Sequence, residues 1–334
     1  MEKKNRLTQI GNIRALAIFL VVLGHSIILY SSAWDLYETS VRVPFLNELK
    51  NIIDIIQMPL FFSLSGYLFV FTHGKNKGIL FLLKNKAKRL LLPYLGIGVL
   101  FLLPIRLLVR FSSYQDMGVF DFAYKLLNAS DMGHLWFLPA LFLIFVLAEL
   151  ILTIVERIPG IRKFPALFLC IAAIGIYLEG YRFSLGYGPL QSAYGYLIWF
   201  SLGYFLNVYQ KPLRKIYSIS LVKWALLVLN IALLAYCLWA DNIRVLIALT
   251  VKALSIVNIY GAMQEKTCTV VQKVDRNSFG VYLFHSPLIY MTFATIPNAS
   301  PVLVVLINLV VFGAAAYGLT ELVRKTKLKV LIGE

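Results

Sequence analysis

Charged residues and cysteines are both scarce in this chain, and each shortage narrows the class of protein that it can be. Only 14% of its 334 residues are charged, whereas 60% are hydrophobic. Acidic residues are the scarcest charged type, because 16 Asp and Glu stand against 32 Lys and Arg. A soluble domain of this size rarely departs so far from average usage. We therefore predict an integral membrane protein whose surface faces lipid.

The three cysteines, Cys170, Cys237 and Cys268, are too widely separated to give the spacing of a metal site. Two of them fall inside apolar segments, where a thiol behaves as a small hydrophobic group. We expect all three to be reduced and structural, and we expect no bound metal.

The net charge of +16 does not indicate a nucleic-acid partner. Nucleic-acid binding requires basic residues gathered on one face of a soluble fold. Here the basic residues stand between apolar blocks, which is the distribution that orients membrane proteins. Membrane lipids are therefore the expected surroundings of these charges.

Apolar blocks long enough to cross a bilayer, about 20 residues each, recur along the whole chain. They predict an all-α integral membrane bundle of about ten transmembrane helices, forming a single domain over residues 1–334 with no additional soluble domain. The blocks lie near residues 11–30, 52–72, 90–110, 134–155, 165–179, 189–208, 221–240, 243–263, 278–296 and 301–323.

The distribution of basic residues predicts that both termini are cytoplasmic. With the N-terminus inside, most of the 32 Lys and Arg fall in inner loops and tails, and only six fall in outer loops. This bias is the one that the positive-inside rule describes. Arg14, Arg106 and Lys252 remain within the predicted spans, and the last two have no partner that the sequence identifies.

Two ionisable residues of the first span, Arg14 and His25, are the first candidates for function, because such groups are costly in a membrane and usually face a bundle interior or a wet cavity. Eleven steps at about 100° and 1.5 Å per residue return to nearly the same helix face, roughly 16 Å further along. Both side chains should therefore face one groove. A snorkelling charge at Arg14 and a satisfied core histidine at His25 are the alternatives.

Further polar residues are expected near the outer ends of two other spans. Asp54 and Gln57 share one face of the second span at i, i+3 spacing, and His134 opens the fourth span at the level of His25. We expect His25, Asp54 and His134 to form an outer polar cluster. Alternatively, His134 faces water or lipid headgroups at the interface.

At the cytoplasmic side, the basic cluster from Lys84 to Arg89 precedes the third span. It suits anionic lipid or, equally, a phosphorylated cofactor. The ninth span carries His285 in its predicted inner half, either as a core histidine or as a functional one.

Five blocks, taken together and in order, resemble the membrane-bound acyltransferase-3 family. The branch most similar to this chain contains fucose acetylase-like and exopolysaccharide-modifying members. The resembling elements are Arg14 and His25 with ten residues between them, Gln57–Tyr67, Lys86–Tyr94, His134–Leu138 and Ser278–Pro287.

The chain departs from the family's pattern at two positions. Gln57 stands where the family often has a histidine, so an acid or base role there is not expected. Lys86 with Arg89 stands where many relatives place an arginine pair, and lysine offers a point charge without the planar fork of arginine. Some members also carry an esterase-like domain after the last span, and none is expected here.

The resemblance implies transfer of an acyl group, acetyl first, from cytoplasmic acyl-CoA to a hydroxyl of a cell-surface glycan or lipid-linked sugar. It also implies the bacterial cytoplasmic membrane, with envelope-biosynthesis partners or a second copy of the chain as possible associates. The expected base is His25, oriented by Asp54 or His134. The residues expected to bind the donor are Arg14, Lys86, Arg89 and His285.

Three other readings stay open from the sequence. The acyl group could pass through a covalent intermediate on a histidine or on Ser26, Ser63 or Ser65. A transporter or flippase for an envelope glycan precursor would use the same intramembrane charges as a substrate path or proton relay. A scaffold subunit of an envelope assembly line would use none of them.

Overall fold

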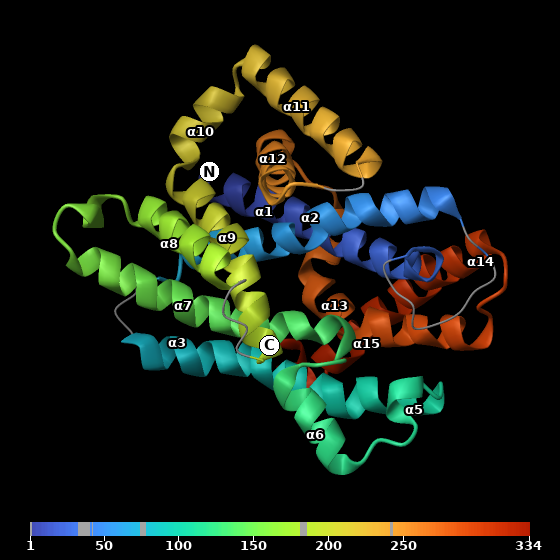
Figure 1. Ribbon diagram of the computed structural model, residues 1–334. Helices are drawn as coiled ribbons and strands as arrows, with labels where there is room; N and C mark the ends of the chain where they lie inside the picture. Colours follow the sequence, from blue (N-terminus) through green and yellow to red (C-terminus); the bar gives the residue numbers. More distant parts are fainter. Residues whose placement is uncertain (1, 33–40, 42, 74–77, 181–185, 241–242) are drawn as a thin grey trace.

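The computed structural model describes residues 2–32, 41, 43–73, 78–180, 186–240 and 243–334, with side chains from residue 8 onward. Every regular element in these ranges is helical (Figure 1). This arrangement agrees with the predicted all-α fold, and it follows from an apolar environment, in which a helix satisfies its own backbone hydrogen bonds.

Ten helical stretches coincide with the ten predicted apolar blocks. They are α1 (Glu2–Ser26), α2 (Pro44–Phe69), the run from α3 (Gly78–Lys86) through α4 (Leu92–Ile97) to α5 (Leu103–Leu108), α7 (Phe137–Arg157), α8 (Pro165–Gly180), α9 (Gly188–Val208), α11 (Ser220–Trp239), α12 (Val245–Ala262), α13 (Thr269–Thr295), and the run from α14 (Pro301–Leu306) to α15 (Gly313–Arg324). Shorter helices, including α6 (Val119–Asn128) and α10 (Gln210–Tyr217), connect them.

Seven stretches are long and apolar enough to cross a membrane, so the chain forms a multi-pass membrane bundle. They are Thr8–Ser26, Pro44–Phe69, Gly78–Leu108, Gly133–Arg157, Ser220–Trp239, Val245–Ala262 and Pro301–Arg324. Of the other three predicted spans, α8 is apolar but has only 16 residues, and α9 and α13 are more polar. Many side chains of α9 and α13 are buried against other helices, so protein contacts rather than lipid determine their composition.

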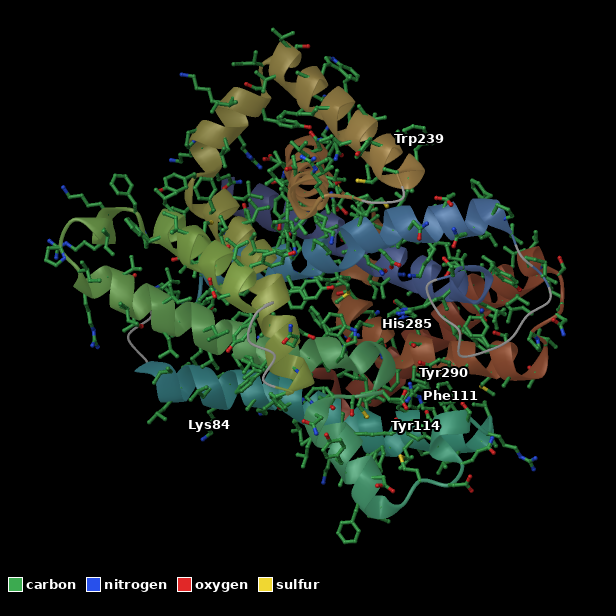
Figure 2. All side chains as sticks on the ribbon, in the orientation of Figure 1. Lys84, Phe111, Tyr114, Trp239, His285 and Tyr290 are labelled. Carbon is green, nitrogen blue, oxygen red and sulfur yellow. The ribbon has the colours of Figure 1, made fainter. Side chains whose placement is uncertain are left out.

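The bundle is built around these two buried helices. Helix α9 packs against α2, α7 and α8, and α13 packs against α1 and α15. Helix α11 lies at the periphery, at the top of Figure 1, and its final Trp239 is labelled in Figure 2. Among the described helices, α13 carries the most buried polar side chains, which are Asn277, Ser278, His285, Ser286 and Thr292.

Helices α2 and α9 approach so closely that only glycine fits at two positions. A Cβ atom on Gly66 would lie 1.8 Å from the carbonyl oxygen of Phe200, and one on Gly203 would lie 1.8 Å from that of Ser63. Small residues at these contacts therefore allow the two helices to pack closely. Ser63 and Ser65 hydrogen-bond to carbonyl groups of their own helix.

Gly203→Ala should destabilise the folded protein, because the new methyl group must separate two backbones. We expect a loss of about 1–3 kcal/mol, the usual cost of overpacking, measured as a lower melting temperature in detergent. Gly195→Ala in the same helix is the matched control, since a Cβ atom there meets nothing within 4 Å. The control should be neutral or slightly stabilising, and equal effects of the two substitutions would contradict the packing argument.

Candidate functional site

Three histidines from three separate segments meet in the interior. His25 ends α1, His134 precedes α7, and His285 lies within α13. Their ring centres are 5.1 Å apart for His25 and His285, 5.3 Å for His134 and His285, and 6.4 Å for His25 and His134. The sequence predicted His25 and His134 at one level but placed His285 further inward, and that placement of His285 was wrong.

The hydrogen bonds around His285 fix which of its nitrogens carries the proton. Its Nδ1 lies 2.9 Å from the carbonyl oxygen of Val281 and 2.8 Å from that of Tyr282, both in the preceding turn of α13. A carbonyl oxygen only accepts, so Nδ1 must be the protonated nitrogen. The Nε2 atom of neutral His285 is therefore an acceptor.

That acceptor in turn fixes the tautomer of His25. The His25 Nδ1 atom lies 2.9 Å from the His285 Nε2 atom, so His25 donates from Nδ1 and its own Nε2 carries a free lone pair. No hydrogen bond to that Nε2 is found from the described residues. A neutral imidazole with an unoccupied, basic nitrogen is the arrangement that a general base requires.

His134 is held from two sides and leaves one acceptor without a partner. Its Nε2 donates to the carbonyl oxygen of Leu283 at 3.1 Å, and the Tyr282 hydroxyl donates to the His134 carbonyl group. The remaining ring nitrogen, Nδ1, is buried and makes no hydrogen bond within the described part of the chain. An orphaned acceptor of this kind indicates a bound water molecule or ligand.

Asp54 does not orient His25 in this arrangement. Its carboxylate contacts Lys50, and the Gln57 amide donates to it at 2.5 Å. Lys252, left unpartnered by the sequence, lies within electrostatic reach of the same carboxylate. The predicted cluster of His25, Asp54 and His134 is therefore corrected: His285 takes the place beside His25, because the i, i+4 pair of Lys50 and Asp54 satisfies the carboxylate locally.

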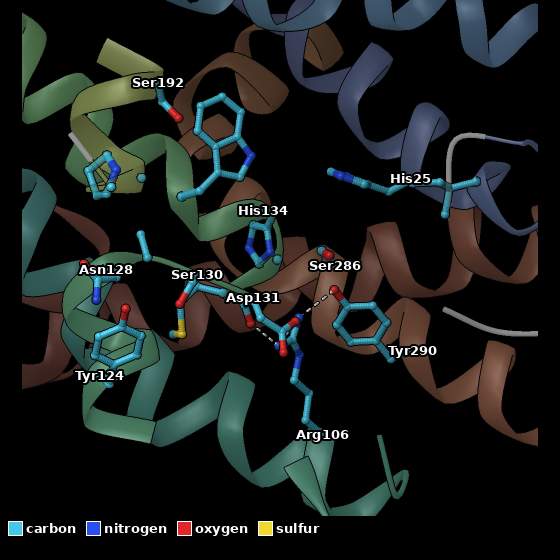
Figure 3. Close-up of a pocket in the computed structure, with 18 residues that line it drawn as sticks. His25, Arg106, Tyr124, Asn128, Ser130, Asp131, His134, Ser192, Ser286 and Tyr290 are labelled. Atoms are coloured by element: carbon cyan, nitrogen blue, oxygen red, sulfur yellow. Dashed lines mark hydrogen bonds and ion pairs between the residues drawn. The ribbon is translucent and has the colours of Figure 1, made fainter. Parts of the chain in front are cut away.

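His25 and His134, but not His285, border a cavity of about 650 Å³, here called the histidine cavity (Figure 3). His25, Trp136 and Tyr290 line it together with Ser192 and Ser286. Its charged lining residues are Arg106 and Asp131, which form an ion pair at 3.2 Å.

Arg106 is the largest fully buried side chain of the described residues, with 1% of its surface exposed. Its guanidinium group lies 4.5 Å from the ring centre of Phe111, 4.7 Å from that of Tyr114 and 5.3 Å from that of Tyr290. Figure 2 shows these three aromatic residues gathered around one point. Cation–π contacts and the ion pair with Asp131 compensate the loss of hydration.

Arg106 also fixes the loop of residues 129–133, which leads directly into His134. Ala129 and Asp131 adopt positive φ angles of 50° and 54°, a conformation that is costly for residues other than glycine. Arg106 and the Tyr114 hydroxyl both donate to the carbonyl oxygen of Asp131. These contacts stabilise the strained loop and thereby place His134.

The Asp131 carboxylate completes this anchor. Burial opposes its ionisation, but hydrogen bonds from Lys125 and Ser113 and the charge of Arg106 hold the pKa of this carboxyl group below its ordinary value. The sequence identified Arg106 as a buried charge but did not identify Asp131, because nothing local to residue 131 indicates that the end of α5 packs against it.

A second cavity, of about 420 Å³ and here called the basic cavity, opens near the other end of α1. Arg14, Lys86, Arg89 and Arg276 supply its positive charge, and Asp275 and Glu334 supply its negative charge. The structure thus brings together Arg14 and the two basic residues that the sequence proposed for phosphate binding.

The basic side chains of this cavity are held to different degrees. Arg14 forms an ion pair with Asp275 at 3.0 Å, a partner that the sequence did not identify. The Lys86 ammonium group lies 3.4 Å from the ring centre of Phe145, whereas Arg89 is exposed within the π-helical turn Ala87–Leu91. Such widened turns are frequent at functional sites.

Aromatic side chains lie between the two cavities. Trp136 lines the histidine cavity, and the next residue, Phe137, lines the basic cavity together with Tyr282. The Tyr282 ring centre is 5.6 Å from that of Phe137 and 5.1 Å from that of His134. We call Phe137 and Tyr282 the aromatic partition.

The three serines considered for a covalent intermediate are engaged elsewhere. Ser26 donates to the carbonyl oxygen of Val22 at 2.7 Å, and Ser63 and Ser65 bond similarly within α2. None of the three hydrogen-bonds to a histidine in the described residues, so none of them is paired with an imidazole base that would activate it.

Comparison with known proteins gives one match. A family model described as an acyltransferase domain, of the acyltransferase-3 family, matches residues 7–320, nearly the whole chain. No curated protein and no solved structure matches this chain.

The hydrogen-bond pattern predicts the tautomers of three of the four histidines in the sequence. At neutral pH, His25 and His285 should carry the proton on Nδ1, and His134 should carry it on Nε2. Nitrogen-15 NMR shifts of histidine-labelled protein in lipid report the protonated nitrogen directly, and single His→Asn substitutions assign the signals. His73, which lies between Glu149 and Glu156 outside the cluster, is an internal reference. An Nε2-protonated His25 would refute the proposed tautomer chain.

Proposed function

The chain belongs to the acyltransferase-3 family, and on that premise we propose that it transfers an acyl group, with acetyl as the first candidate, from acyl-CoA to a hydroxyl of a glycan or lipid-linked sugar. The observation that carries the proposal is the tautomer chain from the carbonyl groups of Val281 and Tyr282 through His285 to His25. It leaves a basic nitrogen at the edge of a cavity large enough for a small ligand.

We further propose that the chain crosses the bacterial cytoplasmic membrane ten times, with both termini in the cytoplasm. The excess of basic residues in the predicted inner loops and tails supports this topology. The cavity linings agree with it, since the basic cavity collects Arg14, Lys86 and Asp275 from predicted inner ends. The histidine cavity collects His25 and His134 from predicted outer ends. The donor then enters from the cytoplasm and the acceptor from outside.

The basic cavity suits the nucleotide part of acyl-CoA. Lys86 and Arg89, which lie one turn apart, would bind phosphate oxygens through charge-assisted hydrogen bonds. Arg14 would orient the pantetheine arm or polarise the thioester carbonyl group. The arm would extend along α1 toward His25, past apolar lining residues such as Leu64 and Leu141.

In the reaction, His25 Nε2 accepts the proton of the acceptor hydroxyl as its oxygen attacks the thioester carbonyl carbon. The new C–O bond forms, the C–S bond breaks, and the departing thiolate takes the proton from the His25 imidazolium. The products are the O-acyl ester and free coenzyme A, and His25 is neutral again. His285 accepts the hydrogen bond from His25 Nδ1 throughout and stabilises the transient positive charge.

Two cavities on opposite sides of a partition would also suit a transporter or flippase for an envelope glycan precursor. The free Nε2 of His25 favours the enzyme, because a transport path needs no preset base. Dependence on coenzyme A separates the two functions: a transporter would move its substrate with a gradient and release no thiol.

His25→Ala should lower acyl transfer by about 10²–10⁴-fold, the usual contribution of a general base. The measurement is release of free coenzyme A from acetyl-CoA by purified protein in liposomes with sugar acceptors. His73→Ala, at a histidine outside both cavities, is the matched control for loss of an imidazole. Equal activity of the His25→Ala variant and the wild type would disprove the base assignment.

Replacing Lys86 and Arg89 by Ala should raise KM for acetyl-CoA at least tenfold, because two phosphate contacts are lost. The same variant should use acetyl-pantetheine, which lacks the nucleotide phosphates, as well as the wild type does. Lys88→Ala is the matched control, since Lys88 is exposed and does not line the basic cavity. An equal loss with both donors would show that the two residues act on something other than the phosphates.

A further inference from the structure

The two cavities differ in the charge that they offer to a ligand. The basic cavity has four cationic side chains against two anionic ones, so it favours an anion. In the histidine cavity the Arg106 charge is already matched by Asp131, and the other polar lining groups are hydroxyl, amide and imidazole groups. An anionic ligand would gain little there, whereas an uncharged, hydroxyl-rich one would find both donors and acceptors.

One of those acceptors has no hydrogen-bond partner among the residues that the structure describes. The Nδ1 atom of His134 is buried and makes no hydrogen bond within the described residues, and the residue as a whole is only 5% exposed. Its proton is committed to Nε2 by the bond to Leu283, so Nδ1 can only accept. A hydroxyl group of a ligand in the cavity is a donor of the right kind.

This acceptor lies beside the proposed base. The His25 and His134 ring centres are 6.4 Å apart, and both residues line the histidine cavity. A diol with hydroxyl groups on neighbouring carbon atoms, making a hydrogen bond of about 2.8 Å from each oxygen, is long enough to reach both rings at this separation of their centres. Two basic nitrogens at this distance can therefore bind two adjacent hydroxyl groups at once.

We propose that the acceptor is an uncharged vicinal diol and that His134 determines this specificity. The inference rests on the proposed function. One hydroxyl gives its proton to His25 Nε2 and is acylated, while its neighbour donates a hydrogen bond to His134 Nδ1. Trp136, two residues after His134, also lines the cavity. Its ring packs against that of Tyr196, with the ring centres 5.4 Å apart, so it offers a rigid apolar face to the carbon skeleton of a sugar.

Six-membered ring alcohols test the proposal without knowledge of the natural acceptor. Purified protein in liposomes receives acetyl-CoA with cis-1,2-cyclohexanediol, trans-1,2-cyclohexanediol or cyclohexanol, and ester formation is measured. The wild type should prefer at least one diol over cyclohexanol by roughly 10- to 100-fold in kcat/KM, because a buried acceptor is left unpaired by the mono-alcohol. The preference should appear mainly in KM.

Two substitutions at His134 separate specificity from folding. His134→Phe keeps an aromatic ring but removes the acceptor, so the diol preference should be lost while acylation of cyclohexanol remains. His134→Gln retains an amide that can donate to Leu283 and a carbonyl oxygen that can accept from the diol, so it should retain part of the preference. Stabilisation by coenzyme A in melting experiments checks that each variant is folded.

The outcomes distinguish the two proposals. Transfer to all three alcohols with equal efficiency, or a diol preference that survives in His134→Phe, would overturn the inference and leave the acyltransferase intact. Transfer to sugar acceptors but to none of the three alcohols would overturn the inference alone, whereas no transfer to any acceptor by folded protein would overturn the proposed function and the inference together.

Discussion

One hydrogen bond, from His25 Nδ1 to His285 Nε2, organises the chemistry of this protein. Its direction is set by main-chain carbonyl groups within α13, which the helix supplies whatever surrounds it. Packing of α1 against α13 then brings His25 next to His285, whose tautomer is already fixed and whose Nε2 atom accepts the hydrogen bond. Carboxylates usually orient catalytic histidines. In the proposed site a neutral imidazole orients His25 instead, which avoids a further buried charge in the membrane.

The buried Arg106 side chain shapes the wall of the histidine cavity. Arg106 is enclosed by aromatic rings and held by Asp131, and the pair stabilises a loop with two positive φ angles in non-glycine residues. Removing either partner would leave the other charge buried and uncompensated. The same loop leads into His134. The buried ion pair and the strained backbone therefore both serve to place a residue of the proposed site.

Local patterns predicted much of this molecule and tertiary packing determined the rest. Apolar blocks located the helices. The spacing of Arg14 and His25 predicted one shared groove, whereas the structure places Arg14 at the basic cavity and His25 at the histidine cavity. Asp54 was assigned to the wrong neighbour because its partner, Lys50, lies on the same helix and satisfies it first. The position of His285 relative to His25 depends on how α13 packs against α1. The role of Asp131 depends on its contact with Arg106 of α5. Neither contact can be read from the periodicity of the sequence.

The aromatic partition has a consequence for the membrane as well as for the reaction. Cavities that penetrate a bundle from both ends shorten the insulating layer to the few side chains between them. Moving one elementary charge across a membrane potential of 100 mV costs about 2.3 kcal/mol. If both cavities hold water, much of this potential difference falls across the thin apolar layer that Phe137 and Tyr282 form. In the proposed topology and function, the residues that separate the two cavities therefore also keep the proton gradient from dissipating, and an acyl group has to cross without opening a continuous path for water.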